Sequence, residues 1–198
     1  MNKLVNFKEN NLTYQIGFSI LLFLASIVWL TTFFFIIGVP IQPFVIPAAA
    51  VVSISVTMYT GNITLKKVIP LATALFLIVG VSAVASSYVY DFSFDGNTYH
   101  KTTIGMLKNG WNPIYKSFEE AALTLKIIPD DYEWPIWYDH YPKASWIIGA
   151  AFYRISGNIE TGKCMNILAC FAVFLILMGR LKQYQLFSIP VRILFSLV

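Results

Sequence analysis

Charged side chains are scarce in this chain of 198 residues. Asp, Glu, Lys and Arg make up 12% of it, against roughly 25% in ordinary globular proteins. None of the four occurs between Asn11 and Leu65, and a soluble fold of this size could not bury so long an uncharged run. A bilayer can, because a spanning helix needs about 20 apolar residues. The sequence therefore predicts an integral membrane protein.

Cysteines and nucleotide-binding motifs are also scarce. The two cysteines, Cys164 and Cys170, stand more than one helical turn apart in a single apolar run, so we expect small core residues rather than a disulfide. Their spacing is not that of a metal site. No Lys/Arg-rich tract accompanies the net charge of +4, so no nucleic-acid partner is expected. The chain has no GxGxxG or P-loop motif, and we expect no nucleotide cofactor.

What the sequence does contain is a series of long apolar runs with basic residues at their ends. Lys3 and Lys8 precede the first run, Lys66 and Lys67 follow the second, and Arg180 follows the last complete one. The excess of positive charge on cytoplasmic segments then places the N-terminus in the cytoplasm. The expected fold is all-α and polytopic, with spans at Tyr14–Ile37, Phe44–Tyr59, Val68–Tyr88 and Met165–Met178.

One long polar segment, from Asp91 to Lys143, interrupts the apolar runs. A structureless loop of this length is uncommon in a folded protein. We therefore expect an extracytoplasmic loop that contains short juxtamembrane helices and carries the function of the protein. Its tryptophans favour the headgroup level of the membrane. It carries both histidines and eight of the ten acidic residues, namely Asp91, Asp95, Glu119, Glu120, Asp130, Asp131, Glu133 and Asp139.

Two later apolar runs are too short to span. Ala144–Ile155 would cover about 18 Å of a core of roughly 30 Å. If it crossed, Arg180 would lie outside, so charge placement favours an interfacial or re-entrant helix. The run Ile189–Val198 has about ten residues and no stop signal. We expect the chain to end inside a span and therefore to be incomplete.

Asp95 is the first candidate for chemistry. It lies in Asp91-Phe-Ser-Phe-Asp95-Gly96, directly after a span and at the start of a helix expected at Thr98–Asn109. The dipole at a helix start favours an ionised carboxylate, which could act as a general base or metal ligand. The structural alternative is that Asp95 is only an N-cap.

A second candidate group is Asp139-His140-Tyr141-Pro142-Lys143, expected to face the same surface as Asp95. Its structural alternative is a polar helix cap with a snorkelling lysine. A divalent cation could be held by Asp95, Asp139 and His140, with Asp91 and His100 as further ligands. Arg154 and Lys163, at the outer boundary, suit either a phosphate or simple interface anchoring.

The order of these motifs resembles the polytopic GT-C glycosyltransferases, the group that includes protein mannosyltransferases and the aminoarabinose and galacturonic-acid transferases of lipid A. Asp95-Gly-Asn-Thr-Tyr99 follows a span, His140-Tyr-Pro142 opens a half-length helix, and Lys163 precedes the next span. The family's acidic pair appears here as Asp95-Gly96, and its Arg as Lys163. The likeness covers about residues 68–182.

The resemblance implies a mechanism and an organisation. The donor would be a sugar on a polyprenyl phosphate, with a glycan, lipid or protein as acceptor in the envelope of a bacterial inner membrane. Residues 1–67 would form an N-terminal hairpin, and 68–198 the start of the GT-C core with its outer loop at 89–163. Asp95 and Asp91 would be catalytic, and the substrate would contact Tyr99, His100, Asp139, His140, Lys143 and Lys163. The rival hypothesis is a non-enzymatic membrane protein, either a transporter segment or an export scaffold, which predicts charged residues inside spans.

Overall fold

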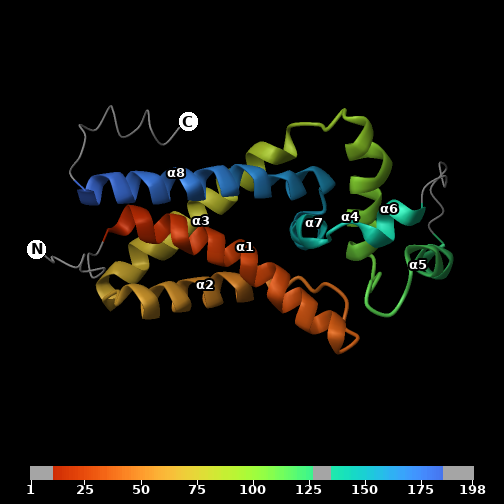
Figure 1. The fold of residues 1–198 in the computed structure, drawn as a ribbon, viewed down its shortest axis with the longest axis horizontal. Helices are drawn as coiled ribbons and strands as arrows, with labels where there is room; N and C mark the ends of the chain where they lie inside the picture. Colours follow the sequence, from red (N-terminus) through yellow and green to blue (C-terminus); the bar gives the residue numbers. More distant parts are fainter. Residues whose placement is uncertain (1–10, 127–134, 185–198) are drawn as a thin grey trace, which may run out of the picture.

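The computed structural model describes residues 11–126 and 135–184, and every regular element in these ranges is a helix. The all-α prediction is confirmed for this part of the chain. Four long helices run lengthwise, and the short ones gather at one end (Figure 1). The long helices are α1 (Leu12–Ile36), α2 (Val45–Gly61), α3 (Leu65–Ser87) and α8 (Cys164–Tyr184). The short ones are α4 (Lys101–Lys108), α5 (Phe118–Leu125), α6 (Pro135–His140) and α7 (Ala144–Ser156).

Within the described residues, three helical segments are long and apolar enough to cross a bilayer: Leu12–Ile36, Leu65–Ser87 and Ile159–Lys182. They support the prediction of a membrane protein. The fourth long helix, α2, has 17 residues, which gives about 26 Å at 1.5 Å per residue. That length is at the lower limit for a span, so the predicted crossing at Phe44–Tyr59 stays a prediction. The predicted last run at Ile189–Val198 lies outside the described residues.

Helix α1 packs along both α2 and α8. At its start, the Asn11 side chain donates to the carbonyl of Gly179 at 2.6 Å, and Arg180 donates to the Tyr14 hydroxyl at 3.4 Å. Helix α8 therefore ends where α1 begins. The turn between α2 and α3, with Asn62 in the left-handed conformation (φ 47°), lies at this same end of the bundle (Figure 1).

The opposite end of the bundle carries α7. Its 13 residues end at Ser156, and the next residue, Gly157, has a φ of +70°, in the left-handed region that closes helices. The next residue, Asn158, donates to the carbonyl of Ser87 at the end of α3. Both ends of α7 thus stay at the far end of the bundle, and the next helix, α8, returns to the end where α1 begins. This arrangement agrees with the prediction that Ala144–Ile155 does not cross.

We expect chemical labelling to reproduce this arrangement in a membrane. In a variant without Cys164 and Cys170, single cysteines at His140 and Asn158 should react from one side of intact cells, because α7 does not separate them. A cysteine at Lys182 should react only from the other side. Reaction of His140→Cys and Asn158→Cys from opposite sides would show that α7 crosses.

The described part of the polar segment, residues 91–126 and 135–143, is folded onto the bundle. The last carbonyls of a helix have no partner within it, and here the side chains of Asn112 and Tyr115 donate to the carbonyls of Phe35 and Ile36 at the end of α1. Behind them a small aromatic core forms, in which Trp111 meets Phe118 edge-on at 5.4 Å. This core holds α4, α5 and α6 in fixed positions at the bundle end.

Candidate functional site

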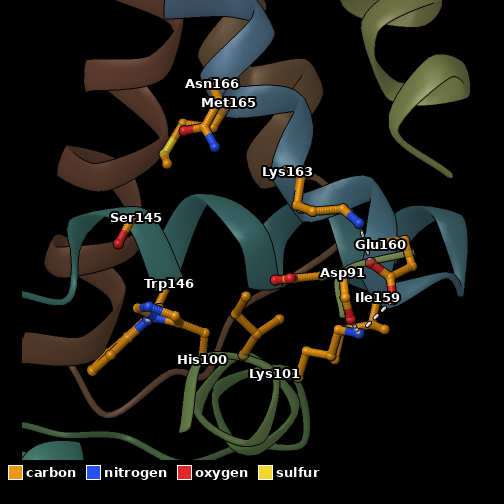
Figure 2. Close-up of a pocket in the computed structure, with 12 residues that line it drawn as sticks. Asp91, His100, Lys101, Ser145, Trp146, Ile159, Glu160, Lys163, Met165 and Asn166 are labelled. Atoms are coloured by element: carbon orange, nitrogen blue, oxygen red, sulfur yellow. Dashed lines mark hydrogen bonds and ion pairs between the residues drawn. The ribbon is translucent and has the colours of Figure 1, made fainter. Parts of the chain in front are cut away.

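A cavity of about 320 Å³ lies where the segment after α3 meets α4, α7 and the start of α8. Its walls carry four charged side chains, Asp91, Lys101, Glu160 and Lys163, as Figure 2 shows. Two are ammonium groups and two are carboxylates, so their formal charges cancel. The cavity lies at one end of two candidate spans, Leu65–Ser87 and Ile159–Lys182.

Glu160 is the centre of this charged group. Its side chain is buried, and its carboxylate accepts from Lys101 at 2.7 Å and from Lys163. Lys101 also donates to the backbone carbonyl of Asp91 at 3.1 Å and to Asn97 at 2.9 Å. Lys163 also donates to the carbonyl of Val89. The two lysines therefore tie the segment after α3 to the start of α8.

His100 lines the same cavity, and its ring is held by Trp146. The indole N–H donates to Nδ1 of His100 at 2.6 Å. An indole can only donate, so Nδ1 must carry a lone pair and the ring proton of the neutral form is on Nε2. The contact thus sets which imidazole nitrogen can donate a hydrogen bond to a ligand.

Asp95 lines a different cavity, of about 240 Å³, together with Phe94, Thr98, Tyr99, Trp137 and Tyr138. Desolvation of the Tyr99 phenol, and next the nearby Asp95 carboxylate, raise the pKa of Tyr99 above its ordinary value. Because Asp95 and Tyr99 line the same cavity, their side chains could act on one ligand. Tyr99 and His100 are sequence neighbours that line the two cavities.

The structural alternative for Asp95, an N-cap, is not what the structure shows. The helix begins before the expected Thr98, with a π-helical turn at Gly96–His100 that leads into α4. Ser93 caps this turn, because its hydroxyl accepts from the backbone N–H of Gly96 at 3.0 Å. Asp95 makes no side-chain cap. Its exposed carboxylate is available for chemistry, and single π turns are frequent at functional sites.

Asp91 is held close against the π turn. Its Oδ1 accepts from the backbone N–H of Ser93 at 2.9 Å, and hydrogen bonds from the Ser93 hydroxyl and N–H hold the pKa of Asp91 below its ordinary value. A Cβ added to Gly96 would lie 1.9 Å from Oδ2 of Asp91. Glycine at position 96 is therefore what allows the Asp91 carboxylate to lie there.

We expect Gly96→Ala to displace the Asp91 carboxylate and raise the pKa of Asp91 toward its ordinary value. The hydrogen bonds that lower this pKa stabilise the fold above the unfolded-state pKa, and their contribution is lost as the pH falls through the folded-state value. A ¹³C NMR titration of labelled Asp carboxyls measures the change. Gly105→Ala, where the added Cβ meets nothing within 4 Å, should leave the titration unchanged. An unaltered Asp91 titration in Gly96→Ala would contradict this account.

The predicted site residues thus separate into three places. Asp91, His100 and Lys163 line the cavity around Glu160, called the charged cavity below. Asp95 and Tyr99 line the cavity with Phe94, Trp137 and Tyr138, called the aromatic cavity below. The predicted group at residues 139–143 lines neither of the two.

Each member of that third group has its own surroundings. Asp139 Oδ1 accepts from the backbone N–H of Phe118 at 2.9 Å, so it caps the start of α5. Lys143 donates to the carbonyl of Asp139 and lies over the rings of Trp111 and Trp146. Burial lowers the pKa of its ammonium group. His140 is exposed.

In the described residues, no three His, Cys, Asp or Glu side chains lie close enough to hold a metal ion. Asp95, Asp139 and His140 therefore do not form a three-ligand cluster in this structure. A divalent cation shared between fewer protein ligands and a phosphate stays a prediction, since Mg²⁺ is often bound through one or two carboxylates and substrate phosphates.

Two of the four charged residues of this cavity were not among the predicted site residues, Lys101 and Glu160. Glu160 does carry a signal in the sequence. Apart from Glu9 it is the only acidic residue outside the loop, and it directly precedes an apolar run. Lys101 carries none, because a lysine after a helix start is common on any solvated surface.

Comparisons of the chain with protein-family models, with curated proteins and with solved structures found no match. The resemblance to GT-C glycosyltransferases therefore rests on the order and spacing of its own motifs.

Proposed function

We propose that the chain belongs to a membrane glycosyltransferase, which transfers a sugar from a polyprenyl-phosphate donor to an extracytoplasmic acceptor. The observation that carries the proposal is the Asp95 carboxylate, which caps no helix, lines a cavity beside Tyr99 and follows directly after a candidate span. A reaction on a lipid-linked substrate needs a base at this level, because the reacting carbon of such a substrate stands just outside the hydrocarbon core.

The proposed reaction is a displacement with inversion. Asp95 takes the proton of an acceptor hydroxyl as that oxygen attacks the anomeric carbon. The bond from this carbon to the phosphate oxygen breaks, and polyprenyl phosphate leaves with the electron pair. A cation near the leaving group would offset its charge, and Lys101, Lys163 or a bound divalent cation could supply it. Asp91, held against the turn that carries Asp95, is the secondary acidic residue.

The proposed orientation places the N-terminus in the cytoplasm of a bacterial inner membrane and residues 89–163 outside. It is supported by the distribution of charge over the bundle. Lys66, Lys67 and Arg180 stand in short segments at the end where α1 begins. The long segment 89–163 spreads its seven lysines and arginines over 75 residues, together with nine acidic residues. Basic residues favour the cytoplasmic side.

The proposal is tested in cells that carry the gene. Its deletion should leave unused polyprenyl-phosphate sugar, detected by mass spectrometry of lipid extracts, and should remove one sugar from an envelope glycan, lipid or protein. Return of the wild-type gene should reverse both changes. If lipid-linked sugars and envelope sugars are the same with and without the gene, the chain is not such a transferase.

A further inference from the structure

The cavity beside Asp95 has walls of an unusual composition. Among the described residues, six line it: four are aromatic, Phe94, Tyr99, Trp137 and Tyr138, and Asp95 is the charged one of these six. A purely apolar ligand would place its surface against an ionised carboxylate without a hydrogen bond, which is costly. The ligand that fits must therefore offer both an apolar face and hydrogen-bond donors.

The aromatic walls are held in place before any ligand binds. Tyr138 is buried, stacks on Phe118 with ring centres 3.9 Å apart, and donates its hydroxyl to the carbonyl of Thr98 at 3.2 Å. Tyr99 stacks on Trp137 at 6.0 Å and meets Tyr141 edge-on at 5.7 Å. A ligand entering this cavity does not have to order these side chains, which preserves affinity.

A pyranose ring has the two required features. Its axial C–H groups form an apolar face with partial positive charge, which is attracted to the negative face of an aromatic ring. Its equatorial hydroxyls point outward from the ring and can donate to a carboxylate, where hydrogen bonds are strong. Trp137 is partly exposed, at 36%, and could contact the C–H face of the sugar. Asp95 and Tyr99 line the same cavity and could form hydrogen bonds with the sugar hydroxyls.

The main competitor is an organic cation, since aromatic rings and a carboxylate also suit an ammonium group. An ammonium group donates hydrogen bonds but accepts none. Thr98 and Tyr99 line the cavity together with Asp95, and a hydroxyl is both donor and acceptor. Hydroxyls of a sugar can satisfy groups of both kinds, so the observations favour a neutral sugar.

We propose that this aromatic cavity binds a pyranose ring of the acceptor, so that the acceptor of the reaction is a carbohydrate rather than a protein side chain. The assignment as acceptor rests on the proposed function. Sugar binding itself does not. The ring would lie with one C–H face on Trp137 and present a hydroxyl to Asp95, the group proposed as base.

The test uses the chain in phosphatidylcholine nanodiscs, without glycoside detergents that would compete. Methyl glycosides of glucose, mannose, galactose and N-acetylglucosamine are the probes, with choline as the cationic alternative. Saturation-transfer NMR on the protein's aromatic signals should mark the ring C–H groups of at least one glycoside. Trp137→Ala should weaken binding about tenfold, the effect of a contact of about 1.4 kcal/mol.

Three control variants keep the result specific. Trp29→Ala removes a tryptophan that is 77% exposed on α1 and should leave binding unchanged. Trp137→Tyr retains an aromatic face and should bind within about threefold of the wild type, which separates lost stacking from misfolding. Asp95→Asn keeps the shape of the cavity and should retain measurable binding.

Some outcomes would overturn the proposal. These are the absence of saturation transfer to every glycoside, binding of choline alone, or equal losses in Trp137→Ala and Trp29→Ala. The result also separates this site from the proposed function. If the chain binds a sugar but gene deletion does not change lipid-linked sugars, the proposed binding site stands and the proposed transferase function is wrong. If gene deletion changes lipid-linked sugars but no glycoside binds, only the proposal of this acceptor site is wrong.

Discussion

Replacing Asp95 with asparagine is expected to lower glycosyl transfer by about 10²–10⁴-fold, the usual contribution of a general base. The amide has nearly the shape of the carboxylate but cannot take a proton from an acceptor hydroxyl. Because the Asp95 side chain caps no helix and is exposed, the change should leave membrane insertion and thermal stability close to those of the wild type. Complementation of the gene deletion, followed by mass spectrometry of lipid-linked sugars, measures the loss.

Asp91→Asn is the matched comparison, because Asp91 lies in the same segment and beside the same turn. Its carboxylate accepts hydrogen bonds from Ser93, and we expect a smaller loss of transfer together with a small loss of stability. The opposite pattern, near-normal transfer in Asp95→Asn and a large loss in Asp91→Asn, would assign the base to Asp91. Normal transfer in both variants would contradict the proposal that one of these two carboxylates is the general base.

The long helices could be predicted from the sequence because their signal is local. An uncharged apolar run forms a helix in a bilayer whatever surrounds it, and the observed helix at Leu12–Ile36 differs from the expected Tyr14–Ile37 by one or two residues at each end. The short length of Ala144–Ile155, together with the position of Arg180, likewise predicted a helix that does not cross, and α7 lies at one end of the bundle (Figure 1).

The details of the acidic turn were less predictable because several residues compete for one role. Asp, Ser and Asn are all good N-caps, and the segment from Asp91 to Asn97 contains each of them. Ser93 takes the cap in the structure, while Asp95 lies within the first turn. Asp139 was expected to face the same surface as Asp95, and nothing in the sequence indicated that it would accept from the backbone N–H of Phe118. Which donor a carboxylate meets depends on tertiary packing that spacing alone does not give.

The charged cavity depends on contacts between segments far apart in the chain. Lys101 and Glu160 meet only because the turn that carries Glu160 lies tightly on α7. Gly162 and Gly149 make this approach possible, since a Cβ on Gly162 would lie 2.9 Å from the Cα of Gly149. No pattern in the sequence pairs these two glycines, so the ion pair could not be predicted before the fold was known.

Replacing Glu160 with glutamine is expected to cause the largest loss of stability among single changes at the site. Glu160 is 4% exposed and accepts from both Lys101 and Lys163. Breaking a buried ion pair costs about 3–5 kcal/mol when the remaining charge is left buried. The two lysine side chains are 23% and 30% exposed, so water compensates in part, and we expect a loss of about 2 kcal/mol. Reversible unfolding in mixed SDS micelles measures it, with the exposed Glu119→Gln as a control that should change little.

A double-mutant cycle shows whether this loss belongs to the ion pairs. In the wild type, Lys101→Met removes one donor from Glu160. In the Glu160→Gln background the same change removes an unpaired charge, and it should therefore cost less or become stabilising. The Lys163→Met cycle should behave alike, because Lys163 meets the same carboxylate from the start of α8. Losses that simply add in both cycles would mean that Glu160 and the lysines act independently. The charged cavity would then not be what joins the segment after α3 to the start of α8.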